Sequence, residues 1–166
     1  MKLEVAFEGN IIPDNYAKAA KETIEGMAIQ SFPFAIMDIP EGTKSLAWTF
    51  LDYDAVPVCG FPYIHWLVAN ASPEDLAIEA NYSMLNKNHL EGKNSLTSKF
   101  LPESVKVIDQ QYIGPKPPDK DHDYLLTVYA LDDHLDLKNG FYYNELLAQL
   151  EVHYLDHAQI KLVGKH

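Results

Sequence analysis

Three short segments place aspartate or histidine beside proline or glycine, at the ends of apolar runs. They are FLDYDAVP (residues 50–57), YIHWLVAN (residues 63–70) and YIGPKPPDKDHDYLL (residues 112–126). A carboxylate and an imidazole can pair, and an imidazole can also donate hydrogen bonds to an anion. Because binding residues concentrate where strands end in loops, these segments predict one shared site.

Asp52 and Asp54 are two residues apart, so they would face the same side of an extended segment. There they could pair, bind a cation or orient an imidazole. A solvated aspartate-rich turn is the simpler explanation of the pair alone. The D-x-D pattern is common, and the fuller calcium-loop pattern is absent.

His65 begins a strongly apolar run, and His122 occupies a matching place two residues before Tyr124. Each could be a core histidine satisfied by one backbone partner, or a residue at the mouth of a site. Two such placements beside proline-containing loops favour the second interpretation. We therefore predict that both imidazoles point into one pocket.

The remaining candidates for chemistry have weaker support. His153 and His157 have the i, i+4 spacing of a zinc helix but lack the glutamate of H-E-x-x-H. Cys59 lacks the surroundings of a catalytic cysteine, and no glycine-rich phosphate loop occurs. We expect His153 to line the site or to pack in a helix. Surface positions are expected for His89, His134, His157 and His166.

The charge balance limits the partners. With 24 acidic and 13 basic residues the formal net charge is −11, which argues against nucleic-acid binding through a broad basic face. All 13 basic residues are lysines, so no arginine fork is present to grip an anion. Histidine, lysine or backbone N–H groups must do so. One cysteine, no export signal and no membrane-spanning run lead us to expect a cytoplasmic protein.

The pattern of apolar residues favours a mainly β domain with peripheral helices. Predicted strands cover residues 2–7, 45–51, 64–69, 105–108 and 124–131. The runs in 64–69 and 124–131 are apolar on both faces, as in strands covered from both sides.

Helical periodicity is found at residues 14–24 and 143–155. Ser72 and Pro73 could begin a further short helix within residues 72–85. Residues 86–104 are polar and irregular and predict a long surface loop.

Taken in order, the three segments resemble signatures of the phosphatidylethanolamine-binding protein family, and in particular its bacterial Raf-kinase-inhibitor-like branch. The first signature, D-P-D-A-P before a histidine-led strand, resembles DYDAVP and HWLVAN. The second, G-x-P-P before a histidine and a tyrosine, resembles GPKPPDKDHDYLLTVYAL. The resemblance implies seven ligand-binding residues: Asp52, Asp54, Pro57, His65, Gly114, His122 and Tyr124.

The resemblance also implies a fold and a function. We expect residues 1–166 to form one domain, an antiparallel β-sandwich with a few peripheral helices. Its small cavity would accept phosphate, acetate or a phospholipid head group. Members of the family are regarded as non-catalytic binding proteins that regulate kinases or proteases, and no cofactor is implied.

Two alternatives stay open. One is a metal-assisted hydrolase that uses the Asp/His pocket, and the other is a partner-binding protein whose pocket is incidental. An aromatic surface such as GFYYNELL (residues 140–147) could also support a homodimer.

The chain departs from the family pattern at three positions. Tyr53 replaces a proline, Val56 is an extra residue, and Asp123 stands where the branch commonly has arginine. An added acid near the pocket mouth would weaken anion binding by about 1 kcal/mol.

The resemblance leads to a hypothesis for how the pocket binds its ligand. Asp52, with or without Asp54, would orient an imidazole. His65, His122, Tyr124 and backbone N–H groups would donate to the oxyanion. Binding would strengthen in acid, around the ordinary histidine pKa of about 6.5.

Overall fold

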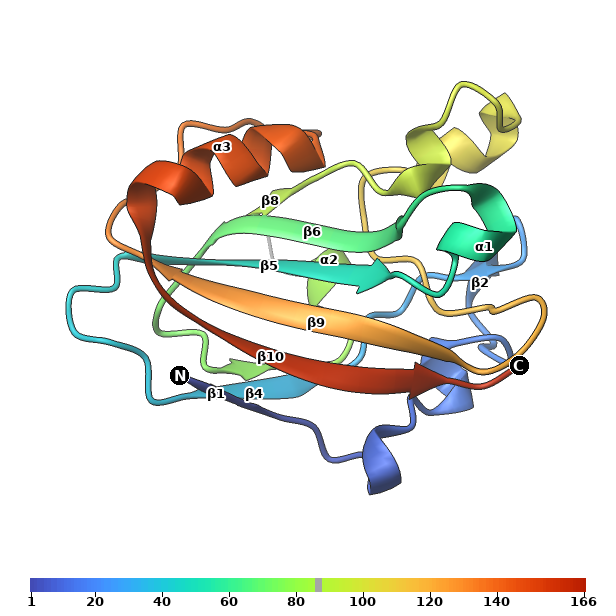
Figure 1. Cartoon of the computed structure of the whole chain (residues 1–166), viewed down its shortest axis with the longest axis horizontal. Helices are drawn as coiled ribbons and strands as arrows, with labels where there is room; N and C mark the ends of the chain where they lie inside the picture. Colours follow the sequence, from blue (N-terminus) through green and yellow to red (C-terminus); the bar gives the residue numbers. More distant parts are fainter. Residues whose placement is uncertain (86–87) are drawn as a thin grey trace.

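The computed structural model describes residues 1–85 and 88–166. Its largest element is a five-stranded antiparallel sheet with the strand order β10-β9-β5-β6-β8 (Figure 1). The strands are β5 (Ser45–Asp52), β6 (Tyr63–Ala71), β8 (Leu90–Glu91), β9 (His122–Leu131) and β10 (Tyr154–Gly164). The two runs predicted to be covered on both faces are β6 and β9, which flank the central strand β5.

Side chains alternate between two cores across this sheet. In β5, Leu46, Trp48 and Phe50 belong to one core, whereas Ala47 belongs to the other. The first core is closed by a three-stranded antiparallel sheet of β1 (Lys2–Glu4), β4 (Phe34–Met37) and β7 (Ala77–Ile78). The second is closed by α3 (Tyr143–His153). The predicted antiparallel, mainly β fold with peripheral helices is confirmed.

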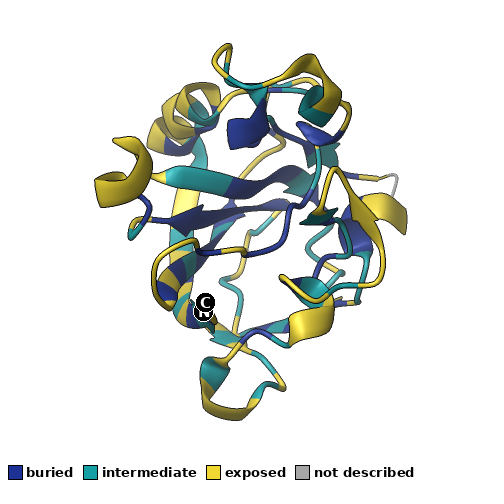
Figure 2. Cartoon of the chain, turned by 90° about the vertical axis from the view of Figure 1, so that its right-hand side faces the viewer, coloured by how far each residue is buried: buried dark blue, intermediate teal, exposed yellow. Residues whose placement is uncertain are grey.

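The remaining elements are short and connect or cover the sheets. They are β2 (Thr23–Ile24), β3 (Met27–Ala28), α1 (Val56–Cys59), α2 (Tyr82–Leu85) and the 3-10 turns η1 (Glu8–Asn10), η2 (Asp14–Tyr16), η3 (Ser95–Thr97) and η4 (Glu103–Ile108). Figure 2 shows buried strand segments inside a shell of exposed helices and loops. None of the helices in the described part of the chain is long and apolar enough to span a membrane.

Several predicted elements are wrong. The helix over residues 14–24 is reduced to η2 and the small strand β2. The carbonyl of Tyr16 accepts a hydrogen bond from Tyr112, and Ala17 is buried in the core with non-helical backbone angles. Tertiary contacts thus override the local helical preference here. The strand over residues 105–108 lies in η4, because a four-residue apolar run cannot distinguish the two conformations.

The segment from Ser72 forms a turn instead of a helix. Ser72 accepts hydrogen bonds from the backbone of Glu74 and Asp75, and β7 then pairs with β4 before the single turn of α2. The predicted loop over residues 86–104 contains β8 and η3 in its described part, and several of its side chains are buried. Its first two residues, 86–87, lie outside the described residues.

The predicted helix over residues 143–155 is correct except at its end. It stops at His153, and Tyr154 begins β10, a strand that the periodicity did not indicate. β10 pairs with β9 along almost its whole length, with a bulge near Tyr154.

Candidate functional site

The strand order brings three of the predicted segments together. β5 lies between β6 and β9 and runs antiparallel to both, so its last residue meets their first residues. Asp52 is paired with Tyr63 on one side and with Tyr124 on the other. This end of the sheet, where β5 stops and β6 and β9 begin, is at the right of Figure 1, beside α1.

A cavity of about 250 Å³ opens at this end of the sheet. It contains Asp52, His65, His122 and Tyr124, four of the seven residues that the resemblance implied. The other lining residues are Met27, Ala55, Val58, Cys59, Tyr63, Lys116, Pro117 and Pro118. The lining is therefore mostly apolar with a few polar groups, as in many small-molecule sites.

His122 is a cavity residue that two carboxylates hold. Its Nδ1 lies 2.7 Å from Oδ2 of Asp52, and its Nε2 lies 2.8 Å from Oδ1 of Asp119. A carboxylate oxygen can only accept, so this geometry favours a ring that is protonated on both nitrogens, an imidazolium. Burial opposes this charge, but the hydrogen bonds to Asp52 and Asp119 prevail and raise the pKa of His122.

Asp52 is a buried carboxylate that organises the cavity floor. Its Oδ1 accepts from the backbone N–H of Ala55 at 3.0 Å, while Oδ2 binds His122. Asp52 also hydrogen-bonds Tyr124; burial, followed by the charge of Asp52, raises the pKa of that phenol. Asp52 and His122 are thus in direct contact, as the predicted orienting role of Asp52 requires, and the role itself stays a prediction.

His65 is held differently from His122. Its Nδ1 lies 2.9 Å from the carbonyl oxygen of Ile113, which can only accept, so Nδ1 carries the proton. Burial lowers the pKa of His65 to about 4, so the ring is neutral at pH 7 and its Nε2 is an acceptor. The ring packs against Tyr63 and Tyr124. His65 thus does not fit the predicted role of donor to an oxyanion.

Asp54 does not share the cavity with Asp52. β5 ends at Asp52 and the chain turns, so the alternation expected of an extended segment stops there. Asp54 instead accepts from the backbone N–H of Asp123 at 2.9 Å and borders a separate hollow. In that hollow the side chain of Asp123 pairs with Lys161 at 2.9 Å. The acid expected to weaken binding at the mouth therefore lies away from the cavity.

Pro57 and Gly114 support the cavity without lining it. Pro57 is in the first turn of α1, and the last two residues of that helix, Val58 and Cys59, line the cavity. The N–H of Gly114 donates to the carbonyl of Ala28, and a Cβ at this position would collide with the carbonyl oxygen of Tyr16. The close approach allows the following Lys116–Pro118 segment to cover the cavity.

The most important residue that the signatures did not indicate is Asp119. It lies three residues before His122 and binds that ring directly. Tyr63 and Lys116 also line the cavity without having been predicted. The spacing of Asp119 from His122 was the available signal, but nothing in the pattern DKDH decides which of its acids turns inward.

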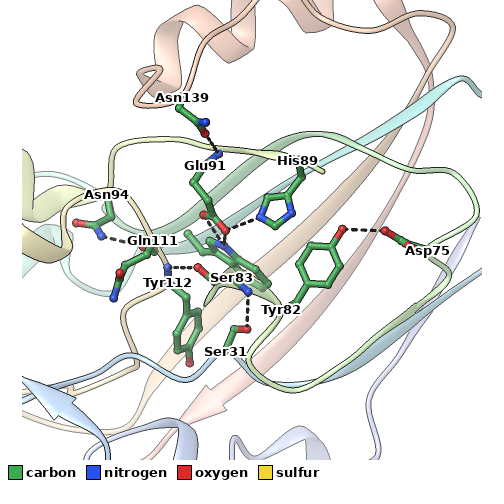
Figure 3. A network of polar contacts seen from close by, with 11 residues as sticks. Ser31, Asp75, Tyr82, Ser83, His89, Glu91, Asn94, Gln111, Tyr112 and Asn139 are labelled. Atoms are coloured by element: carbon green, nitrogen blue, oxygen red, sulfur yellow. Dashed lines mark hydrogen bonds and ion pairs between the residues drawn. The ribbon is translucent and has the colours of Figure 1, made fainter. Parts of the chain in front are cut away.

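A second histidine–carboxylate pair is buried in the protein (Figure 3), and neither of its residues lines the cavity. Nε2 of His89 is 2.8 Å from Oε1 of Glu91, and Nε1 of Trp66 donates to the same carboxylate at 2.9 Å. The ring of His89 stacks on Tyr82 with 4.6 Å between centroids. The predicted surface position of His89 is therefore wrong, because partners distant in sequence bury it.

Other candidate sites are less complete. The described residues contain no group of three or more His, Cys, Asp and Glu side chains arranged to hold a metal ion. His153 does not line the cavity but contacts Asp132 at 3.0 Å. A larger hollow of about 530 Å³ borders α2, but the described residues around it include neither a histidine nor a cation.

Comparison with known proteins agrees with this fold and these signatures. The family model for phosphatidylethanolamine-binding protein matches residues 3–164. The chain belongs to the phosphatidylethanolamine-binding protein family. A relative, the uncharacterised protein YxkA of Bacillus subtilis, is 44% identical over 160 residues, which are 92% of each chain.

Solved structures of this family superpose over nearly the whole chain. The phosphatidylethanolamine-binding protein homologue CT736 of Chlamydia trachomatis has a TM-score of 0.77 and 27% identity, covering 99% of this chain and 95% of that one. YbcL of Escherichia coli has a TM-score of 0.76, with coverage of 99% and 98%. Its 20% identity makes it evidence for the fold alone. The family resemblance predicted from the signatures is confirmed.

Proposed function

We propose that the cavity binds a small oxyanion without catalysing a reaction, namely phosphate, acetate or the phosphate of a phospholipid head group. One observation carries the proposal: His122 lines a small cavity and is held by two carboxylates that favour its charged form. In a mostly apolar lining a positive charge acts on an anion more strongly than in water, although Asp52 and Asp119 offset part of this charge. Family membership fits a binding role of this kind.

The polar groups of the cavity divide into donors and acceptors. His122 supplies donors to an oxyanion, and Lys116 also lines the cavity, with its ammonium 3.3 Å from the carbonyl oxygen of Gly26. The neutral His65 offers an acceptor, so it suits a hydroxyl or other proton-bearing group of the ligand. A singly protonated phosphate has both kinds of group, whereas acetate has acceptors alone. We therefore expect phosphate to bind more tightly than acetate.

The cavity would have a regulatory role if another protein bound differently to its filled and its empty form. α1 and the Lys116–Pro118 segment form the rim, so a partner that contacts the rim would sense whether the cavity is filled. We propose that this partner is a kinase or a protease. Binding of the anion is the part that can be tested with the protein alone.

The test is a calorimetric titration of inorganic phosphate into the wild type and into His122→Asn. We expect the variant to bind at least about tenfold more weakly, because a buried charge-assisted hydrogen bond is lost. His134→Asn is the matched control, since His134 is exposed in a loop. Equal affinity of all three proteins would rule out this site.

The pH dependence follows from the raised pKa of His122. Because the charged ring is the donor, binding is strong in acid and is lost as the pH rises through that pKa, above the ordinary 6.5. His65 does not add a positive charge until the pH approaches about 4. An affinity that rose with pH would contradict the assignment of His122 as the cation.

A further inference from the structure

Both donors of His122 are already occupied by carboxylates of this chain, and the two carboxylates differ in their freedom to leave. The side chain of Asp52 is 5% exposed and is also held by Ala55, whereas that of Asp119 is 51% exposed. Asp119 follows the rim residues Pro117 and Pro118. An oxyanion entering the cavity therefore meets His122 with its Nε2 donor taken by Asp119.

We propose that Asp119 is a tethered competitor, whose carboxylate holds the position on Nε2 of His122 that the oxygen of a bound anion takes. This inference rests on the proposed function and adds a residue that sets affinity and selectivity. Binding becomes an exchange of one carboxylate for another oxyanion at the same donor. The side chain of Asp119 turns outward to solvent when the ligand enters.

The surrounding contacts favour a movement of the side chain over a movement of the loop. The segment around Asp119 is fastened by His166, whose backbone N–H donates to Asp121 at 2.9 Å and whose Nδ1 contacts the carbonyl of Pro117 at 3.1 Å. Lys165 pairs with Asp121 as well. The backbone can therefore stay in place while the half-exposed carboxylate leaves.

The exchange makes the site selective. A tethered group three residues away has a high effective concentration, so it outcompetes a free ligand that makes only the same hydrogen bond. Acetate offers one carboxylate and gains little by replacing another. Phosphate has further oxygens for other groups of the cavity, so it can displace Asp119. Selection against simple carboxylates is the expected consequence.

The experiment compares acetate and phosphate binding to Asp119→Ala and to the wild type by calorimetry at pH 6. This pH lies below the ordinary histidine pKa, and the remaining bond to Asp52 still favours the charged ring of His122. We expect acetate to bind about tenfold more tightly to the variant, and phosphate to gain less. Asp123→Ala is the control, because it removes the same charge one residue from His122, but the side chain of Asp123 pairs with Lys161 at a separate hollow. Its affinities should stay within about twofold of the wild type.

The outcomes separate this inference from the proposed function. Acetate binding that improves in Asp119→Ala alone supports the competitor, including the case in which the wild type shows no acetate binding. A second outcome is phosphate binding that depends on His122, together with acetate affinity that is unchanged or lower in Asp119→Ala. This outcome overturns the competitor role of Asp119 but supports the anion site. Equal gains in Asp119→Ala and Asp123→Ala reduce the effect to general charge and also overturn it. If neither variant nor wild type binds either anion, both proposals fall.

The carboxyl group of Asp119 gives a second measurement. In the free protein its hydrogen bond to His122 holds the pKa of Asp119 below the ordinary value. Displacement by phosphate should return that pKa toward the ordinary value, which carbon NMR of the labelled carboxyl group can follow. An Asp119 titration that is the same with and without saturating phosphate would show that the carboxylate does not leave.

Discussion

The two histidine–carboxylate pairs have nearly the same length but opposite settings. His122 and Asp52 are 2.7 Å apart at the cavity, and His89 and Glu91 are 2.8 Å apart in the closed interior (Figure 3). The second nitrogen of His122 binds the half-exposed carboxylate of Asp119, which we propose leaves when an anion binds. The second nitrogen of His89 is buried and has no hydrogen-bond partner in the described part of the chain. A histidine–carboxylate pair thus lies both at a cavity and in the closed interior.

What surrounds each carboxylate explains the difference. Glu91 lies on the two-residue strand β8 and accepts from Trp66 of β6 as well as from His89, and Asn139 binds its backbone N–H. The pKa of Glu91 is raised, because the effect of burial exceeds the opposing effect of the hydrogen bond to His89. These contacts fasten a short edge strand to the core. Asp52, in contrast, lines the cavity of about 250 Å³.

The largest effect that would separate the two pairs is expected from Glu91→Ala. Removing this carboxylate leaves Trp66 and His89 with buried donors or acceptors that have lost their partner. Breaking a buried pair from one side costs about 4 kcal/mol, so urea unfolding should show a large loss of stability. Phosphate affinity of the folded fraction should be unchanged. A variant that kept wild-type stability would show that the interior pair contributes little to the fold.

The next largest effect concerns the loss of stability in acid that His65 causes. Its folded-state pKa of about 4 lies below the ordinary 6.5, so the folded protein favours the neutral ring. This contribution is fully present above pH 6.5 and is lost as the pH falls from 6.5 toward 4. Its full size is at most about 3 kcal/mol. The contribution of His122 to stability has the opposite pH dependence. Because its pKa is raised, this contribution is present below the ordinary histidine pKa and is lost as the pH rises through the raised pKa.

His65→Asn tests this sign. The amide can still donate to Ile113 but does not titrate, so the variant should lose less stability than the wild type between pH 6.5 and 4. Urea midpoints measured across that range provide the comparison, with His134→Asn as an exposed control. Parallel pH profiles of the wild type and His65→Asn would contradict a neutral, buried His65.

The sequence predicted the cavity end of the fold better than the periphery. The apolar runs of β5, β6 and β9 are long and continuous, so their positions and the placement of Asp52 and His122 at their ends could be inferred. β10 was missed because polar and apolar residues mix in YLDHAQIKLVG, and its partner β9 determines its conformation. The helix over residues 14–24 was wrong because the core holds Ala17 in place.

The site residues that could not be predicted depend on contacts between distant segments. His89 lies in the polar stretch NKNHLEGKN, and only its pairing with Glu91 and the stacking of Tyr82 bury it. The neutral state of His65 depends on the carbonyl of Ile113, which no side-chain pattern reveals. The hydrogen bond from His122 to Asp119 requires the fold of a proline-containing loop.

Asp52→Asn should give the smallest change in stability and thereby sharpen the contrast with Glu91. The amide preserves the shape of the carboxylate and can still accept from Ala55, so the variant should lose about 1 kcal/mol of unfolding free energy. Its effect on binding should be larger, because the pKa of His122 falls when the carboxylate charge is removed. Phosphate binding measured at pH 7.5 should weaken about five- to tenfold and recover partly at lower pH, which favours the protonated ring. A loss of several kcal/mol with unchanged phosphate affinity would place Asp52 with Glu91, as a structural carboxylate.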